Sequence, residues 1–170
     1  MGRRTVRGMV TWAEFEGQAP ELAALGEARF RATGLAIVGT LRSDGRPRIT
    51  PVEPRFVDGE LQLGMMWQSR KALDLLRDPR CAVHSPTSDK DGSEGDFKLY
   101  GTAEHVSDPG RRERHCQVTQ EEIGWRPDDD EFHVFSIDIE EVAYAKFGEG
   151  EPKIYSWRPG GDLRRLRTQS

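Results

Sequence analysis

The stretch LAIVGTLRSDGRPRITPVEPRFV, residues 35–57, decides the fold of this 170-residue chain. Two largely apolar segments, 35–42 and 47–57, flank Ser43-Asp44-Gly45-Arg46, and an Asp-Gly pair between such segments is typical of a tight β-hairpin. The first segment is apolar at consecutive positions, so its strand presents apolar side chains on both faces. We therefore predict a hairpin in the wall of a β-barrel that is also covered on its outer face by helices or by a partner chain.

The same alternation of strand and turn signals continues beyond the hairpin. Further strands are predicted at residues 60–67, 80–85, 96–106, 132–139, 142–147 and 153–158, and helices at 20–33, 69–78 and 108–122. The sum is a mainly β protein, an antiparallel split β-barrel of six to eight strands with a few short flanking helices. One domain is expected over residues 1–170, with a helical N-terminal segment at about 11–33 and the barrel at about 35–158.

Two basic regions are predicted at the surface. Arg111, Arg112 and Arg114 in the helix after Asp108 have several glutamates nearby, which is typical of a solvated helix face. The tail after Pro159 is also basic and is predicted to be loose.

Composition excludes several classes of function. The formal net charge of -4 argues against a nucleic-acid or membrane-surface binder. There is no apolar stretch of membrane-spanning length and no signal peptide, so a cytoplasmic protein is expected. Cys81 and Cys116 are predicted to be buried thiols rather than a disulfide. The four histidines lack metal-ligand spacing, so no metal site is predicted.

Ser69-Arg70-Lys71 is the sequence feature that points most directly to a ligand. Ser69 is predicted to cap a helix that ends before Pro79, which puts Arg70 and Lys71 in the first turn. The positive end of the helix dipole disfavours cations there. A bound phosphate would reverse this, because backbone N–H groups, a hydroxyl and two cations would all contact it favourably. The alternative is two solvated basic residues on a surface helix.

Four features follow one another in a characteristic order: the strand end Arg48-Ile49-Thr50-Pro51-Val52-Glu53, the strand 61–67, Ser69-Arg70-Lys71, and Asp78-Pro79-Arg80. This order resembles the pyridoxamine 5'-phosphate oxidase-like, FMN-binding split-barrel family. The resemblance is good over residues 35–106 and extends to the C-terminal third only in outline. It implies a homodimer in which each flavin lies between two subunits.

The resemblance also implies roles for individual residues. Arg70 and Lys71 would hold the flavin phosphate next to Ser69, and Asp96 would border the flavin. The segment Arg48, Ile49, Thr50, Pro51 and Val52 would run along the flavin, and the strand pair around Gly64 and Met65 would cover its ring system. Trp157 is the candidate aromatic contributed by the other subunit, and the alternative for it is a lid over its own barrel.

The function implied is a flavin-dependent oxidoreductase that transfers hydride to or from a small conjugated or heteroaromatic substrate. The cofactor would be FMN, or alternatively the deazaflavin coenzyme F-420. Because such a cofactor carries the chemistry, no catalytic residue is predicted. A carrier that binds flavin or haem without turnover is the alternative. Glu53 stands where the family's oxidases have a substrate-contacting lysine, and a carboxylate there repels a phosphorylated substrate. A genuine pyridoxamine 5'-phosphate oxidase is therefore only the second alternative.

Overall fold

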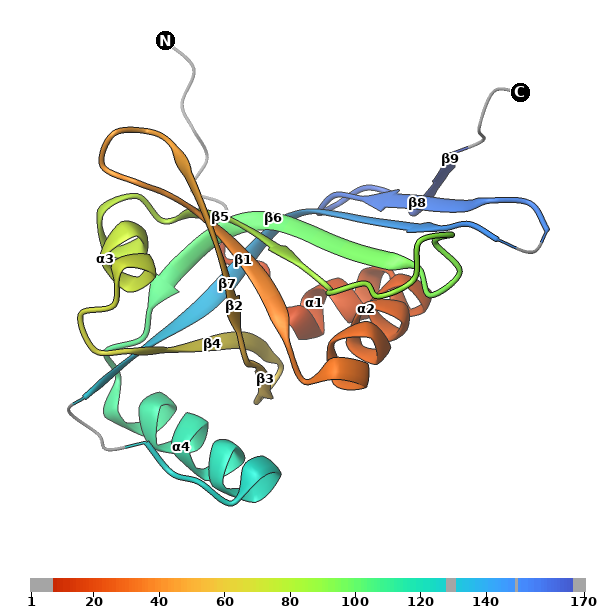
Figure 1. Cartoon of the computed structure of the whole chain (residues 1–170). Helices are drawn as coiled ribbons and strands as arrows, with labels where there is room; N and C mark the ends of the chain where they lie inside the picture. The colour runs from red at the N-terminus through yellow and green to blue at the C-terminus, as the bar shows by residue number, and fades with distance from the viewer. Residues whose placement is uncertain (1–7, 128–130, 149, 167–170) are drawn as a thin grey trace, which may run out of the picture.

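A computed structural model of the chain describes residues 8–127, 131–148 and 150–166 (Figure 1). The helices are α1 (Trp12–Gln18), α2 (Pro20–Thr33), α3 (Arg70–Arg77) and α4 (Pro109–Ile123). The strands are β1 (Ala36–Leu41), β2 (Pro47–Val52), β3 (Pro54–Val57), β4 (Glu60–Met66), β5 (Arg80–His84), β6 (Asp96–His105), β7 (Phe132–Lys146), β8 (Lys153–Trp157) and β9 (Arg164–Leu166). The predicted mainly β architecture is confirmed.

The strands form one antiparallel sheet that curls into an open barrel. Its order is β2-β1-β5-β6-β7-β4-β3, with β8 on β7 and β9 on β8, so the described residues form nine strands rather than six to eight. In this part of the chain the end strands β2 and β3 are not hydrogen-bonded to each other, although only Glu53 separates them in the sequence. The barrel is therefore split at Glu53.

The predicted continuous strand at 47–57 is thus wrong in one respect. Pro54 has no N–H to donate to a ladder, and a proline restricts the backbone of the residue before it. The chain consequently leaves the first part of the sheet after Val52 and enters the other part at Pro54.

The opposite correction applies to the strands predicted at 132–139 and 142–147, which form the single strand β7. Its register with β6 shifts between Tyr100 and Gly101, so that Glu140 has no direct partner there. A bulge of this kind absorbs an extra residue without ending the strand. Gly101 is required, because a Cβ at this position would lie 1.9 Å from the carbonyl oxygen of Asp138.

Aromatic side chains from the N-terminal helices fill the main core. Trp12 and Phe15 of α1 pack against each other and against Phe97 of β6, and Phe30 of α2 meets the same ring edge-on. Leu22 and Phe30 are buried as predicted, and Leu25 is partly buried. A second cluster, Val106, Cys116, Phe132 and Val134, fixes α4 on the other side of the sheet. Both cysteines are buried thiols, as predicted.

The arginines of α4 do not form the predicted solvated face. Arg111 joins Glu60 of β4 to Glu104 of β6, with N–O distances of 2.9 and 2.8 Å. Arg112 lies over the Phe132 ring and donates to the Phe132 carbonyl. Arg114 reaches the exposed carboxylate of Asp58. The neighbouring glutamates suggested a solvated face, but Arg111 and Arg112 lie on the side of the helix that faces the sheet.

The C-terminal segment also differs from the prediction. Residues 164–166 form β9 on the edge of β8 instead of a loose segment.

Candidate cofactor and substrate pocket

The first turn of α3 has the features of an anion site. Ser69 is the N-cap residue, as predicted, but its side chain makes no capping hydrogen bond. Within the described part of the chain its hydroxyl oxygen is buried and has no hydrogen-bond partner. A buried hydroxyl without a partner loses the free energy of one hydrogen bond, about 1–3 kcal/mol, unless a ligand supplies that bond. Arg70 is exposed beside it, and Lys71 is half-buried.

A buried carboxylate holds α3 against the β1–β2 hairpin. Asp74 accepts from Arg48 Nε at 2.6 Å, from the Thr40 hydroxyl at 2.9 Å and from Arg77 at 3.2 Å. Burial acts to raise the pKa of Asp74, but these hydrogen bonds outweigh it and the pKa is lowered. The predicted flavin contact Arg48 is therefore committed through its Nε atom to positioning the helix.

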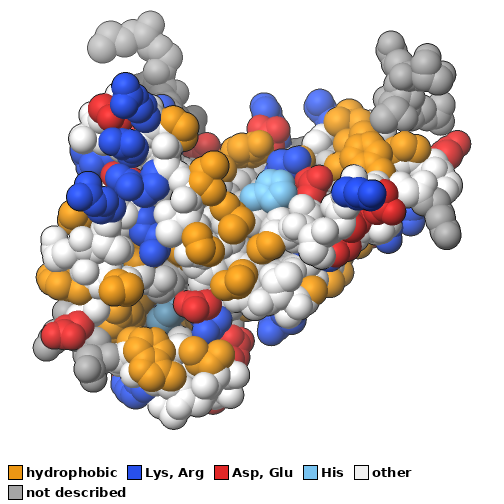
Figure 2. Space-filling model, viewed as in Figure 1, with side chains coloured by type: hydrophobic (Ala, Val, Ile, Leu, Met, Phe, Trp, Pro, Cys, Tyr) orange, Lys and Arg blue, Asp and Glu red, His pale blue; other side chains and the backbone are white. Residues whose placement is uncertain are grey.

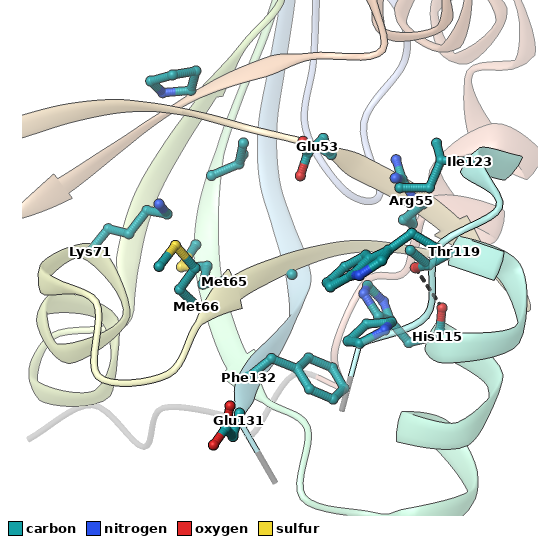
Figure 3. Close-up of a pocket in the computed structure, with 15 residues that line it drawn as sticks. Glu53, Arg55, Met65, Met66, Lys71, His115, Thr119, Ile123, Glu131 and Phe132 are labelled. Carbon is teal, nitrogen blue, oxygen red and sulfur yellow. Dashed lines mark hydrogen bonds between the residues drawn. The ribbon is translucent and has the colours of Figure 1, made fainter. Parts of the chain in front are cut away.

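A cavity of about 380 Å³ opens next to this helix. It lies between the Glu53 break, β4 and α4, with Lys71 at one end and the side chains of α4 at the other (Figure 3). Its lining is mostly apolar and consists of Pro51, Val52, Glu53, Arg55, Gly64, Met65, Met66, Lys71, His115, Thr119, Ile123, Trp125, Pro127, Glu131 and Phe132. An apolar cleft with a few polar groups is the usual form of a small-molecule site.

The cavity brings together part of the predicted site. Six predicted residues line it: Pro51, Val52, Glu53, Gly64, Met65 and Lys71. Arg48 and Thr50 lie on the Val52 face of β2, as predicted, but they do not line the cavity.

Three predicted residues lie elsewhere. Ile49 points to the opposite face of β2 and is 74% exposed. Asp96 forms an ion pair with Lys98 at 2.9 Å. Trp157 is buried in the core of its own chain, 1% exposed, with its ring 4.8 Å from that of Phe15. This burial matches the alternative reading of Trp157, and no surface of its ring is left for a second subunit.

The contribution of α4 was not predicted. His115, Thr119 and Ile123 recur every four residues, so they share one helix face, and that face lines the cavity. The spacing alone could have revealed this face. The rules for metal-ligand spacing do not address a single histidine on a helix face. Among the described residues no group of three or more His, Cys, Asp or Glu side chains is placed to hold a metal ion.

His115 is the most perturbed titratable group of the cavity. It is 3% exposed, and its Nδ1 lies 3.0 Å from Gln62 Oε1. Burial, together with the positive charges of Arg55 and Arg112, lowers the pKa of His115 to about 4. The imidazole is therefore neutral at physiological pH.

The side chain of Glu53 is exposed. Its side chain stands at the mouth of the cavity, in the gap between β2 and β3. This exposure weakens the predicted repulsion of a phosphorylated substrate. At an exposed site two charges about 4 Å apart interact by only about 1 kcal/mol, because water screens them.

Comparison with known proteins identifies the family. Residues 25–146 match the family described as pyridoxamine 5'-phosphate oxidase. A comparison with curated proteins finds no match. No described helix has both the length and the hydropathy needed to cross a membrane.

Solved structures share the fold at low identity. An FMN-binding protein related to pyridoxamine 5'-phosphate oxidase from Nostoc punctiforme is 14% identical, with a TM-score of 0.63, over 89% of this chain and 96% of that one. PhzG from Burkholderia lata, solved with tetrahydrophenazine-1-carboxylic acid, is 13% identical, with a TM-score of 0.61, over 94% and 93%. A haem-binding protein from Mycobacterium smegmatis is 21% identical, with a TM-score of 0.57, over 79% of this chain and 57% of that one. The chain thus spans little more than half the length of the mycobacterial protein. From the family match and the shared open barrel, we conclude that the chain belongs to the pyridoxamine 5'-phosphate oxidase family of FMN-binding split barrels.

Proposed function

We propose that this protein is an FMN-dependent oxidoreductase that acts on a small conjugated or heteroaromatic substrate. The observation that carries the proposal is the buried Ser69 hydroxyl, which has no partner in the described chain and lies at the start of α3 beside Arg70 and Lys71. A phosphate would satisfy this hydroxyl and the free N–H groups of the helix together.

The residues present fit a flavin phosphate at one end of the cavity and a planar ring beyond it. Ser69, Arg70 and Lys71 would hold the phosphate, and Val52, Gly64 and Met65 would contact the ring. When bound, the flavin supplies hydride-transfer chemistry. The chain contributes orientation and the exclusion of water, since Val52 and Met65 are buried and the cavity is mostly apolar.

Titration tests the cofactor. The purified protein is titrated with FMN, coenzyme F-420 and haemin, which absorb at different wavelengths. We expect FMN to bind. Ser69→Ala should lower the affinity for FMN about tenfold or more, because it removes one hydrogen bond to a charged group. Arg46→Ala is the control, because Arg46 is exposed at the hairpin tip. Equal affinity of the parent and Ser69→Ala for FMN would contradict the anchor.

Turnover is tested separately. The FMN-loaded protein is reduced anaerobically and mixed with neutral heteroaromatic and quinone acceptors. Reoxidation faster than that of free reduced FMN supports an oxidoreductase. Reoxidation no faster than that of free reduced FMN, for every acceptor, would indicate a carrier.

A haem carrier is the second candidate function. Its supporting observation is His115, a neutral imidazole that lines the cavity, because imidazole nitrogen is a common ligand of haem iron. Tight haemin binding that is lost in His115→Leu, combined with no FMN binding, would favour this candidate.

A homodimer is part of the proposal. Ile49 of β2, Gly39 of β1, Ala82 of β5 and Tyr100 of β6 follow one another across the outer face of the sheet. Ile49 and Tyr100 are 74% and 45% exposed, and Figure 2 shows hydrophobic side chains gathered over these strands. An apolar face of this kind is typical of an obligate interface. Sedimentation at micromolar concentration should show a dimer, and Ile49→Glu should shift it toward monomer.

A further inference from the structure

A chain of hydrogen bonds fixes the proton of His115. Glu60 of β4 accepts from Arg111 at 2.9 Å and from Gln62 Nε2 at 2.8 Å, both through Oε2. Burial acts to raise the pKa of Glu60, but the hydrogen bonds from Arg111 and Gln62 outweigh it and the pKa is lowered. Glu60 is therefore an ionised, acceptor-only group.

This fixes the orientation of the Gln62 amide. Its NH₂ group must face the Glu60 carboxylate, so its oxygen faces His115. An amide oxygen can only accept a hydrogen bond, and hence Nδ1 of the neutral His115 ring carries the proton. The other ring nitrogen, Nε2, consequently bears a lone pair.

The lone pair of Nε2 lies at the cavity wall. A Cβ on Gly64 of β4 would lie 3.0 Å from Nε2, so any side chain at this position would crowd the nitrogen. Gly64 and His115 both line the cavity, and Figure 3 shows His115 on the side opposite Lys71. Among the described residues no group donates a hydrogen bond to Nε2, and the nearby Thr119 hydroxyl donates to the His115 carbonyl at 2.8 Å instead.

The imidazole is also held rigidly. The Phe132 ring stacks on it, with the ring centres 6.0 Å apart and the planes 23° apart. Its backbone belongs to α4, which the Val106–Cys116–Phe132–Val134 cluster fixes to the sheet. A rigid acceptor of fixed polarity discriminates between ligands, because a ligand that lacks a donor leaves the acceptor desolvated and unpaired.

We propose that His115 Nε2 is a specificity-determining acceptor that selects ligands presenting a neutral N–H or O–H donor on a planar ring at the α4 end of the cavity. The proposal rests on the proposed function for the place of the cofactor, since the phosphate anchor occupies the Lys71 end. The donor has two possible sources with the same chemistry: the imide N–H at the edge of a flavin ring, or a group on the substrate.

A matched pair of probes tests the acceptor directly. Indole carries an N–H donor, and benzofuran has nearly the same shape with an ether oxygen in its place. Binding of each is measured by calorimetry, with the protein both free of FMN and loaded with FMN. We expect indole to bind about tenfold more tightly than benzofuran, the ratio that one hydrogen bond provides. His115→Leu should abolish the ratio, and Gln117→Ala, on another face of α4 and outside the cavity lining, should leave it unchanged.

The two arms of the test distinguish the sources. A preference for indole in both forms identifies the substrate as the source of the donor. A preference for indole only in the FMN-free form, together with a change in the His115 ring resonances when FMN is added, identifies the flavin edge as the source of the donor. Failure of indole to bind, or equal binding of the two probes in the FMN-free form, overturns the proposal.

A second measurement does not depend on any variant. Nitrogen-15 spectra of the histidines at pH 7 report which ring nitrogen carries the proton. We expect the Nδ1–H form for His115, with an Nε2 resonance that moves when indole is added but not when benzofuran is added. An Nε2–H form or a charged ring at pH 7 would overturn the proposal. Lack of FMN binding alongside a preserved indole preference would instead contradict only the proposed function.

Discussion

Acidification should destabilise this protein through His115 well before the carboxylates titrate. The pKa of His115 is lowered from 6.5 to about 4 by burial and by the charges of Arg55 and Arg112. Between these two values the unfolded state binds a proton that the native state does not bind. The free energy of unfolding therefore falls as the pH falls, and the stability present above pH 6.5 is lost progressively toward pH 4.

The magnitude follows from the two pKa values. Between pH 7.5 and pH 5 the unfolded state gains about 2 kcal/mol from protonation of this one residue, and the loss reaches about 3 kcal/mol at pH 4. His105 and His133 also have lowered pKa values, mainly through desolvation, and their losses add to that of His115. Both residues remain in a His115 variant, so their contribution cancels in a comparison of slopes.

Urea unfolding followed by tryptophan fluorescence measures the effect. The parent and His115→Leu are unfolded at half-unit pH steps from 7.5 to 5. The parent should lose about 2 kcal/mol more than the variant over this range, whatever their absolute stabilities. Parallel curves for the two proteins would refute the reasoning, since they would mean that the native imidazole is protonated as easily as the unfolded one.

Three further tests address other parts of the structure. Arg70→Ala combined with Lys71→Ala should weaken FMN binding at least a hundredfold in a fluorescence titration while leaving the thermal midpoint unchanged, because neither side chain is buried in the core. Arg112→Ala should lower the free energy of unfolding by about 2 kcal/mol, through loss of the Phe132 contacts, whereas Arg114→Ala, whose partner is exposed, should change it by less than about 0.5 kcal/mol. Glu53→Lys should tighten binding of pyridoxamine phosphate only about thirtyfold, since reversing an exposed charge changes the interaction by about 2 kcal/mol, and a change of a thousandfold or more would show that Glu53 is buried in the working assembly.

Local rules predicted the elements whose ends are set by single residues. Ser69 and Pro79 bracket α3, and Asp108 with Pro109 begins α4, because capping and proline geometry act within a few residues. The same rules led to the proposed anchor at the start of α3.

The parts of the fold and of the site that local rules do not predict depend on which face of a helix or strand packs against another element. The sequence predicts a solvated face for the arginines of α4, because the charges along one helix do not show that Arg111 contacts Glu60 and Glu104 on two different strands. The α4 side of the cavity was missed for the same reason, since His115 becomes a functional candidate only when Gln62 and Gly64 lie against it. These partners lie about fifty positions away in the chain.

The length of β7 has a consequence for biosynthesis. This strand pairs with β4 and β6, which are made before it, and with β8, which is made after it. Until residues 132–146 have left the ribosome, β4 and β6 each present an unpaired edge, and such edges are prone to pair with other chains. The barrel is thus expected to close only late in synthesis, and a chain truncated after α4 should aggregate rather than persist as a smaller folded unit.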